Sequence, residues 1–237
     1  MPPASAAREG HPPRPIRSYT PRYRTSALTR SRMERLLPRY GVGHLPIDPQ
    51  ALFDRRAALV LEIGAGHGAA AIAYAAAHPQ EDVLVAEVHV PGVVRMLAAA
   101  ENAAVGNIRV YVGDAVDLLG GLPPASVSRV HLLFPDPWPK RRHQKRRFVQ
   151  RHTLAAIRRL LVPGGVLLVA TDHPVYAAHV LAQFAGCQGF AVGEVRRPEW
   201  KPLDGFEAKG LAAGRTPIYL EARSRPDLGA VSGDAGA

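Results

Sequence analysis

Short apolar runs alternate with helical patterns along most of this chain, and this alternation limits the possible folds more than any other feature. We expect strands at Ala58–Ile63, Val83–Glu87, Ile108–Val112, Val127–Phe134 and Val166–Thr171, with later ones near Gly189–Gly193 and Ile218–Ala222. Helical patterns lie at Ala69–Ala77, Val93–Ala104, Lys145–Leu161 and Val175–Phe184. Continuously apolar strands joined by helices predict an α/β fold, with a mostly parallel seven-stranded sheet and helices on both faces.

The length of the chain fits one sizeable domain with extensions, since it has 237 residues. Residues 1–15 are rich in Pro, Ala and Gly, which predicts a disordered N-terminal tail, and the small, polar residues 225–237 predict a flexible C-terminal tail. Residues 16–224 are then the domain, with a basic N-terminal extension. No apolar run reaches the ~18 residues of a membrane span.

Cysteine and histidine usage bears on compartment and metals. The single cysteine, Cys187, excludes an intramolecular disulfide and a thiolate metal cluster. It fits a reducing compartment, so we expect a cytoplasmic protein. The histidines lack metal-ligand partners at useful spacing, and we expect no metal.

The positive charge of the chain is concentrated in two segments. Residues 1–40 contain nine Arg against Glu9 and Glu34, and residues 140–159 contain nine Lys or Arg and no acid. Because the formal net charge is +10, the rest of the chain is net negative. An acidic body with concentrated basic segments is the pattern of a protein that binds a phosphate backbone, which predicts a nucleic-acid partner.

One carboxylate, Asp136, lies between two prolines and two aromatic residues in the segment Phe134-Pro-Asp-Pro-Trp-Pro-Lys140. Each proline fixes its own φ and disfavours the α region in the preceding residue, so we expect a stiff, extended turn. Such a turn can direct one acceptor toward a ligand, and the cations that follow it would bind phosphates. The combination indicates an enzyme that acts on a nucleic-acid base.

Further acids end or follow the predicted strands, namely Glu62, Glu87, Asp114 and Asp172. Ligands bind beyond the carboxyl ends of parallel strands, so these residues are expected to lie together. Glu87 is placed to accept both hydroxyls of a ribose, and Asp114 to accept from an adenine amino group.

Three glycines, Gly64, Gly66 and Gly68, lie between the first strand and the following helix, where they allow the backbone to approach a ligand closely. The third glycine of the dinucleotide fingerprint is missing, which disfavours a nicotinamide-dependent oxidoreductase. Glu62 would also sit poorly beside a pyrophosphate, and it suits a ligand with an ammonium group.

The ordered acids Glu62, Glu87 and Asp114 resemble those of class I S-adenosylmethionine-dependent methyltransferases. Further motifs, spread between about Ile16 and Arg223, resemble one family, the bacterial-type tRNA (guanine-N7-)-methyltransferases: Ile16-Arg-Ser-Tyr19, Leu61-Glu-Ile-Gly64, Glu87-Val-His-Val-Pro-Gly92, Asp114-Ala115, Phe134-Pro-Asp-Pro-Trp-Pro-Lys-Arg-Arg-His143, Thr171-Asp172 and Phe206-Glu207. The resemblance implies a Rossmann-like class I methyltransferase fold and S-adenosyl-L-methionine as the cofactor. It also implies methylation of tRNA at N7 of a variable-loop guanosine (position 46), which forms 7-methylguanosine.

The resemblance assigns roles to particular positions. It implies cofactor contacts at Glu62, Gly64, Gly66, Gly68, Glu87, Asp114 and Asp136, the last of which is also the catalytic position. It implies RNA contacts at Arg142, His143, Gln144, Lys145, Arg146 and Arg147, and substrate contacts at Lys140, Asp172, Asp204 and Glu207. The family's late Thr-x-x-Glu motif reads Asp204-Gly-Phe-Glu207 here, so Asp204 either contacts substrate or caps a turn.

Two other functions compete with an RNA base methyltransferase. A small-molecule methyltransferase would use the same cofactor pocket but would leave the two basic segments unexplained. An RNA-binding protein without catalysis would leave the acids at the strand ends without a role. The partner expected is tRNA and not a membrane, and the chain is expected to act as a monomer or a homodimer.

Overall fold

The computed structural model describes residues 26–203 and 205–225. Three parts of the sequence prediction lie outside the described residues: the N-terminal tail at residues 1–15, residues 226–237 of the C-terminal tail, and Asp204. The strands are Leu59–Ile63 (β1), Asp82–Glu87 (β2), Ile108–Val112 (β3), Val127–Leu133 (β4), Leu161–Thr171 (β5), Phe190–Val195 (β6) and Ile218–Ser224 (β7). The helices are Ala27–Tyr40 (α1), Pro49–Phe53 (α2), Ala69–Ala77 (α3), Val90–Asn102 (α4), Ala115–Gly121 (α5), Arg151–Leu160 (α6), Pro174–Ala185 (α7) and Gly205–Ala212 (α8), with a 3₁₀ helix at Arg141–Arg146 (η1).

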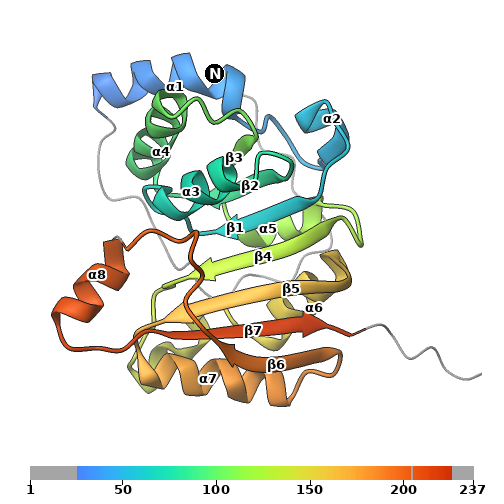
Figure 1. Cartoon of the computed structure of the whole chain (residues 1–237), viewed down its shortest axis with the longest axis vertical. Helices are drawn as coiled ribbons and strands as arrows, with labels where there is room; N and C mark the ends of the chain where they lie inside the picture. The colour runs from blue at the N-terminus through green and yellow to red at the C-terminus, as the bar shows by residue number, and fades with distance from the viewer. Residues whose placement is uncertain (1–25, 204, 226–237) are drawn as a thin grey trace, which may run out of the picture.

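The strands form one seven-stranded sheet in the order β3-β2-β1-β4-β5-β7-β6 (Figure 1). The first five strands pair in parallel, and β7 is antiparallel to both β5 and β6. The predicted mostly parallel, Rossmann-like sheet is therefore confirmed. Because successive connections run in opposite directions from β1, a ligand crevice is expected beyond the carboxyl ends of β1 and β4.

Helices cover both faces of the sheet, as the continuous apolar strands predict (Figure 1). Val60 and Val85 pack in one cluster with residues of α1, α3 and α4. Leu61 and Leu84 point to the other face and pack with residues of α5, α6 and α7. Alternate side chains of a strand point to opposite faces of the sheet. Because helices cover both faces, all side chains of β1 and β2 are buried. Packing on both faces therefore holds these two strands, and with them Glu62 and Glu87, firmly in the sheet.

The helix predicted at Lys145–Leu161 is wrong at its start, because α6 begins only at Arg151. Arg147 has φ −64° and ψ 139°, which is extended backbone and ends the preceding 3₁₀ helix. Gln150 then begins α6 with a capping box, in which its backbone N–H donates to Oγ1 of Thr153 at 3.0 Å. The basic segment is therefore a separate short element in front of α6.

Four helices are absent from the sequence prediction: α1, α2, α5 and α8. The longest, α1, contains Pro38 and many arginines, which hide its apolar face in the sequence. It is capped by the side chain of Ser26, and it buries Leu36 and Tyr40 against the cluster that contains α4. Arg35 also donates to both carboxylate oxygens of Glu101 on α4, at 2.6 and 2.7 Å.

Candidate active site

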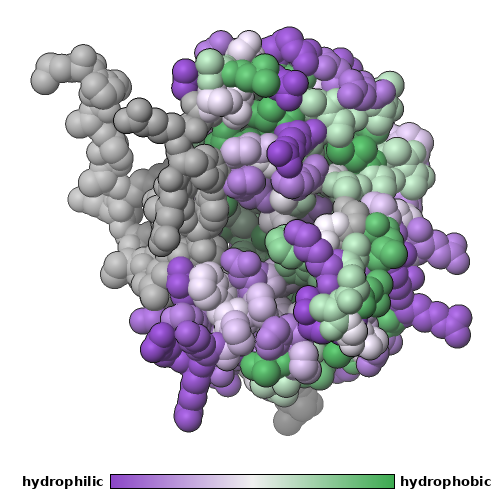
Figure 2. Space-filling model, turned by 90° about the vertical axis from the view of Figure 1, so that its left-hand side faces the viewer, coloured by the Kyte–Doolittle hydropathy of each residue, from purple (hydrophilic) through white to green (hydrophobic). Residues whose placement is uncertain are grey.

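The acids expected at the strand ends lie along one edge of the sheet. Glu62 and Glu87 are within β1 and β2, and Asp172 directly follows β5. Asp114 is the N-cap of α5, just after β3, and its Oδ1 accepts from the N–H of Val116 at 2.9 Å. Figure 2 faces the left-hand side of Figure 1, toward which β1 and β4 point, and shows a hollow bordered by hydrophilic residues.

The three glycines after β1 all adopt left-handed backbone, with φ of 73° at Gly64, 59° at Gly66 and 77° at Gly68. A Cβ added to Gly64 or Gly66 would meet no atom of the described residues within 4 Å. A Cβ on Gly68 would instead lie 2.1 Å from Cγ of Met96, on α4. Two of the glycines therefore leave space for a ligand beside the backbone, whereas the third allows α3 and α4 to pack.

The carboxylate of Glu87 fixes this glycine turn to the end of β2. Its Oε2 accepts from the N–H of Gly66 at 2.7 Å, and its Oε1 accepts from the N–H groups of Val88 and His89, both at 2.7 Å. An ionised carboxylate offers about four acceptor positions. Three are used by backbone amides, so about one remains for a hydroxyl of a ligand.

Glu62 has the most unusual surroundings among the acids. It is only 2% exposed, and no group of the described residues forms a hydrogen bond to its Oε2. The nearest basic atom, Nδ1 of His131 on β4, is 3.7 Å away, and burial lowers the pKa of His131 although Glu62 raises it. A buried, unsatisfied carboxylate oxygen is costly, and an ammonium group on a ligand would satisfy it.

These groups fit S-adenosylmethionine, the cofactor that the resemblance implies. Its ammonium group matches the unsatisfied oxygen of Glu62, and one of its ribose hydroxyls matches the remaining acceptor position of Glu87. Gly64 and Gly66 leave the space that its bulk requires. The fit depends on side chains that the fold already holds in place, since β1 and β2 are buried throughout.

Asp136 lies in the loop between β4 and η1, which has neither helix nor strand, as the prolines predict. The loop differs from the expected extended turn, because Phe134 and Trp138 have φ of 51° and 40°. Left-handed backbone is strained for such bulky residues and needs support from its surroundings. The N–H of Phe134 donates to the carbonyl of Ala170 at 2.8 Å, and its ring packs edge-on against Tyr219.

The carboxylate of Asp136 is exposed at the surface, but the atoms packed around it still affect its ionisation. Burial raises the pKa of Asp136 above its ordinary value, and the positive charge of Arg146 opposes this effect. Arg146 is held by Trp138, since its guanidinium carbon lies 3.6 Å from the centroid of that ring. The basic segment and the acidic loop therefore interact directly.

The residues of the basic segment differ in their exposure. Arg142, Gln144 and Lys145 are exposed, His143 and Arg146 are partly buried, and Lys140 is exposed just before η1. Arg147 is only 3% exposed. Five of the six predicted RNA contacts thus reach the surface, and Arg147 does not.

Two of the predicted substrate contacts are occupied by other residues of the chain. Oδ2 of Asp172 accepts from Nε of Arg215 at 2.8 Å, and the residue stays partly exposed. Glu207 on α8 is 1% exposed. It accepts from Nε of Arg197 at 2.9 Å, from Nζ of Lys201 at 2.6 Å and from the hydroxyl of Tyr219 at 2.5 Å.

Sequence reasoning missed the partners of Glu207. Lys201 and Tyr219 are buried, and Nζ of Lys201 lies 5.1 Å from the centre of the Phe134 ring. The only signal for them in the sequence is that a buried Glu needs cationic partners, and this need does not identify which residues supply them. The fold brings them to the loop of Asp136 from the β6–α8 connection and from β7.

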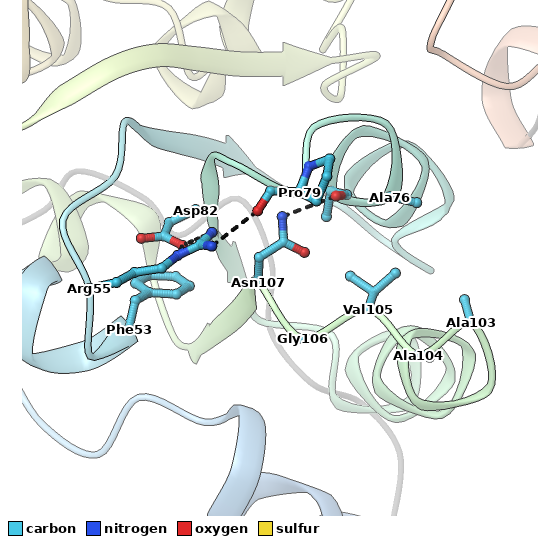
Figure 3. A pocket seen from close by; sticks show the side chains of 11 residues that line it. Phe53, Arg55, Ala76, Pro79, Asp82, Ala103, Ala104, Val105, Gly106 and Asn107 are labelled. Atoms are coloured by element: carbon cyan, nitrogen blue, oxygen red, sulfur yellow. Dashed lines mark hydrogen bonds and ion pairs between the residues drawn. The ribbon is translucent and has the colours of Figure 1, made fainter.

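A hollow of about 470 Å³ lies at the opposite edge of the sheet, where β2 and β3 begin (Figure 3). Nε of Arg55 donates to Asp82 at 2.7 Å, and its other nitrogens donate to the carbonyls of Pro79 and Glu81. The side-chain amide of Asn107 donates to the carbonyls of Ala75, His78 and Glu81. The side chains of Arg55 and Asn107 thus form hydrogen bonds between the chain segments that surround the hollow.

Residues 26–203 and 205–225 include no group of three or more His, Cys, Asp or Glu side chains placed to bind a metal ion. Within the same residues, every helix is too short or too polar to cross a membrane.

The chain is similar in sequence to known methyltransferases. A family model described as "Putative methyltransferase" matches residues 56–215. The tRNA (guanine-N(7)-)-methyltransferase of Nitrosospira multiformis is 44% identical over 214 residues, which cover 87% of this chain and 93% of that protein. The protein of the same name from Chromohalobacter salexigens is 40% identical over 223 residues, which cover 90% of this chain and 91% of that protein.

Solved structures share the fold. An rRNA methylase from Streptococcus thermophilus has a TM-score of 0.51 and 12% sequence identity to this chain, with 87% of this chain and 100% of that chain covered. At this identity the likeness concerns the fold alone, and it agrees with the strand order described above.

Proposed function

The chain belongs to the tRNA (guanine-N(7)-)-methyltransferase family, and on this premise we propose that it methylates N7 of a guanosine in tRNA, with S-adenosyl-L-methionine as the methyl donor. One observation supports the proposal above the others. The buried carboxylate oxygen of Glu62, which has no hydrogen-bond partner among the described residues, lies at the same edge of the sheet as the Asp136 loop. That loop adjoins an exposed basic segment, so the proposed cofactor and RNA sites are neighbours.

The proposed cofactor site consists of Glu62, Glu87, Asp114 and the glycine turn. When bound, S-adenosyl-L-methionine supplies a methyl group on a sulfonium centre. We assign Glu62 to its ammonium group, Glu87 to one of its ribose hydroxyls and Asp114 to its adenine amino group. Gly64 and Gly66 permit close approach of the backbone, because a side chain at either position would enter the open space.

Asp136 is the proposed catalytic residue. Guanine N7 carries an unprotonated lone pair, so the reaction needs orientation of the base more than it needs a strong general base. Orientation of two reactants supplies at most about 7–11 kcal/mol of a barrier. We assign Asp136 to the N1–H and amino group of the guanine, where its negative charge also offsets the positive charge that develops on the ring.

The proposed tRNA site extends from the Asp136 loop onto η1. Lys140, Arg142 and Lys145 are exposed and positive, and they are assigned to phosphates. His143, Gln144 and Arg146 complete this surface. Asp172 is assigned to the substrate, and Asp204, outside the described residues, stays a prediction. Glu207 acts through Lys201 and Tyr219, which it holds beside Phe134.

The test is methyl transfer from labelled S-adenosyl-L-methionine to an unmethylated tRNA transcript, with the modified nucleoside identified by mass spectrometry. We expect 7-methylguanosine with the wild-type protein and a large loss with Asp136→Asn, which keeps the size of the side chain and removes its charge. Cofactor binding without any transfer to tRNA would overturn the substrate assignment and would favour a small-molecule methyltransferase.

The position of the methylated guanosine is tested by a matched pair of transcripts. Guanosine 46, in the variable loop, is the proposed target. A transcript with adenosine at this position should accept no methyl group, whereas a transcript with a changed guanosine in another loop should be methylated normally. Transfer to both transcripts alike would contradict this target.

The cellular setting is also a proposal. We propose that the protein acts in the cytoplasm, which its single thiol, Cys187, supports, and that it is a monomer or a homodimer. Sedimentation of the full chain at micromolar concentration distinguishes the two states, and a larger assembly would contradict both.

A further inference from the structure

Arg147 is a buried cation in a segment otherwise suited to binding RNA. Its side chain is 3% exposed, and none of the carboxylates in the described residues forms an ion pair with it. Placing a guanidinium group inside a protein is costly unless hydrogen bonds satisfy it. Its position is also unsuitable for a phosphate backbone, which binds cations at the surface.

The hydrogen bonds of Arg147 are directed at the catalytic loop. Its Nε donates to the carbonyl of Pro137 at 3.0 Å, and its Nη2 donates to the carbonyl of Trp138 at 3.0 Å. These two carbonyls directly follow Asp136 in the chain. Trp138 is also one of the two strained residues of the loop, with φ of 40°. The planar guanidinium group thus holds the strained side of the loop with two bonds at once.

Arg147 is itself fixed to the start of α6. Its carbonyl accepts from Nε2 of Gln150 at 3.2 Å, and its N–H donates to the carbonyl of Gln144 at 3.0 Å. Nε2 of Gln150 also donates to the carbonyl of Gln144 at 2.9 Å. A continuous series of hydrogen bonds therefore runs from α6 through Arg147 to the residues beside Asp136.

We propose that Arg147 is a positioning residue, which holds Pro137 and Trp138 so that Asp136 faces the target guanine, and that it does not contact tRNA. This inference rests on the proposed function. It separates Arg147 from Arg142–Arg146, which the resemblance groups with it as RNA contacts. It also assigns a role to Arg147, the one buried Lys or Arg in Arg142–Arg147.

Arg147→Lys tests the inference, because lysine keeps the positive charge and loses the planar pair of donors. For a positioning residue, we expect kcat to fall about 10- to 100-fold, the effect of a small displacement of a catalytic group. The Kd for tRNA and its dependence on salt should stay unchanged. For an RNA contact, lysine would bind phosphate nearly as well as arginine, and kcat would stay at the wild-type value.

Two further variants make the outcome decisive. Lys145→Ala removes an exposed cation, so it should weaken tRNA binding and lower its salt dependence, a defect that Arg147→Lys should not show. Arg147→Ala should lose kcat and recover part of it with millimolar guanidinium chloride but not with methylammonium chloride. All rates are measured at a temperature below the unfolding midpoint of each variant. If Arg147→Ala does not fold, the result with Arg147→Lys alone decides.

The results also separate this inference from the proposed function. An inactive wild-type protein would contradict the proposed function. An active wild-type protein with unchanged kcat in Arg147→Lys, or with weakened tRNA binding as the only defect, would overturn the role of Arg147.

Discussion

At the residue scale, the ionisation of Asp136 depends on a neighbour that is itself held in place. Arg146 stacks on Trp138, and its positive charge lowers the pKa of Asp136 against the raising effect of burial. Only the ionised carboxylate offers both oxygens as acceptors for the N1–H and the amino group of a guanine. Arg146 therefore extends the pH range in which the proposed catalytic residue is ionised.

Arg146→Ala is expected to move the acid limb of kcat/KM to higher pH, because removal of a positive charge raises the pKa of Asp136 further. Arg146→Lys keeps the charge and should leave the limb close to that of the wild type. Arg142→Ala, at an exposed residue of the same segment, serves as the control. The measurement is the pH profile of methyl transfer, and an unmoved limb in Arg146→Ala would argue against this coupling.

A second residue, Gly92 on α4, packs closely against the glycine turn of the proposed cofactor site. A Cβ at this position would lie 2.4 Å from the carbonyl oxygen of Gly66, in the glycine turn. The contact is with backbone, so the turn must move to admit a side chain. The sequence shows Gly92 only as part of a motif, and nothing in the pattern indicates the turn that it touches.

Gly92→Ala is expected to strain the turn by about 1–3 kcal/mol and to weaken cofactor binding about 10-fold. Gly120→Ala is the matched control, since a Cβ there meets no described atom within 4 Å, and alanine in helix α5 should stabilise the fold slightly. Calorimetric titration with S-adenosyl-L-methionine measures both variants. Equal affinities would show that the turn tolerates the displacement.

At the scale of elements, Glu207 connects α8 to the sheet and to the loop of Asp136. Burial raises the pKa of Glu207, but hydrogen bonds from Lys201, Tyr219 and Arg197 lower it more, and the net shift is downward. A carboxyl group whose pKa is lower in the folded state than in the unfolded state stabilises the fold above its unfolded pKa. That stability is lost as the pH falls below the ordinary value of 4.5.

Glu207→Gln is expected to destabilise the protein by about 3–5 kcal/mol at neutral pH, because it leaves Lys201 buried without its counter-charge. Thermal unfolding should show this loss, and the difference from the wild type should shrink as the pH falls below 4.5. Glu199→Gln, at an exposed position, should unfold like the wild type at neutral pH. A constant difference across this pH range would contradict the ionic role of Glu207.

The elements also show where sequence patterns succeed. Strands β1 and β2 could be predicted because each is an apolar run buried on both faces, and the acids at their ends were placed with them. Strand β6 buries only Phe190, and the sequence indicated it only approximately. Helices α1, α5 and α8 could not, because they are short, glycine-containing or arginine-rich, and tertiary contacts stabilise them. The burial of Arg147 was also hidden, since its sequence neighbours are exposed cations.

At the scale of the whole molecule, the two edges of the sheet differ in the use of their polar groups. At the edge of β2 and β3 where these strands begin, Arg55 and Asn107 bond to the chain itself (Figure 3). At the carboxyl edge, Glu62 keeps a buried oxygen that no described group satisfies. The polar groups described at the first edge are therefore satisfied within the chain, whereas the carboxyl edge keeps bonding capacity for a ligand.

The charge distribution of the whole chain predicts a steep salt dependence. If about six phosphates are bound, tRNA affinity should fall about 10³-fold between about 50 and 200 mM salt. The affinity for S-adenosyl-L-methionine should change little, because its proposed contacts involve few exposed charges. Filter binding and calorimetry compare the two, and a tRNA affinity independent of salt would contradict phosphate binding.

The attachment of Arg147 to both η1 and the Asp136 loop limits how this enzyme can change. The exposed residues proposed to contact RNA and the residue that holds Pro137 and Trp138 are adjacent in the chain, and Gln150 joins them to α6. An insertion or deletion in this segment would displace Arg147 relative to Pro137 and Trp138. Recognition of new RNAs can therefore evolve, or be engineered, by exchanging exposed side chains at constant length, but not by grafting a longer basic loop.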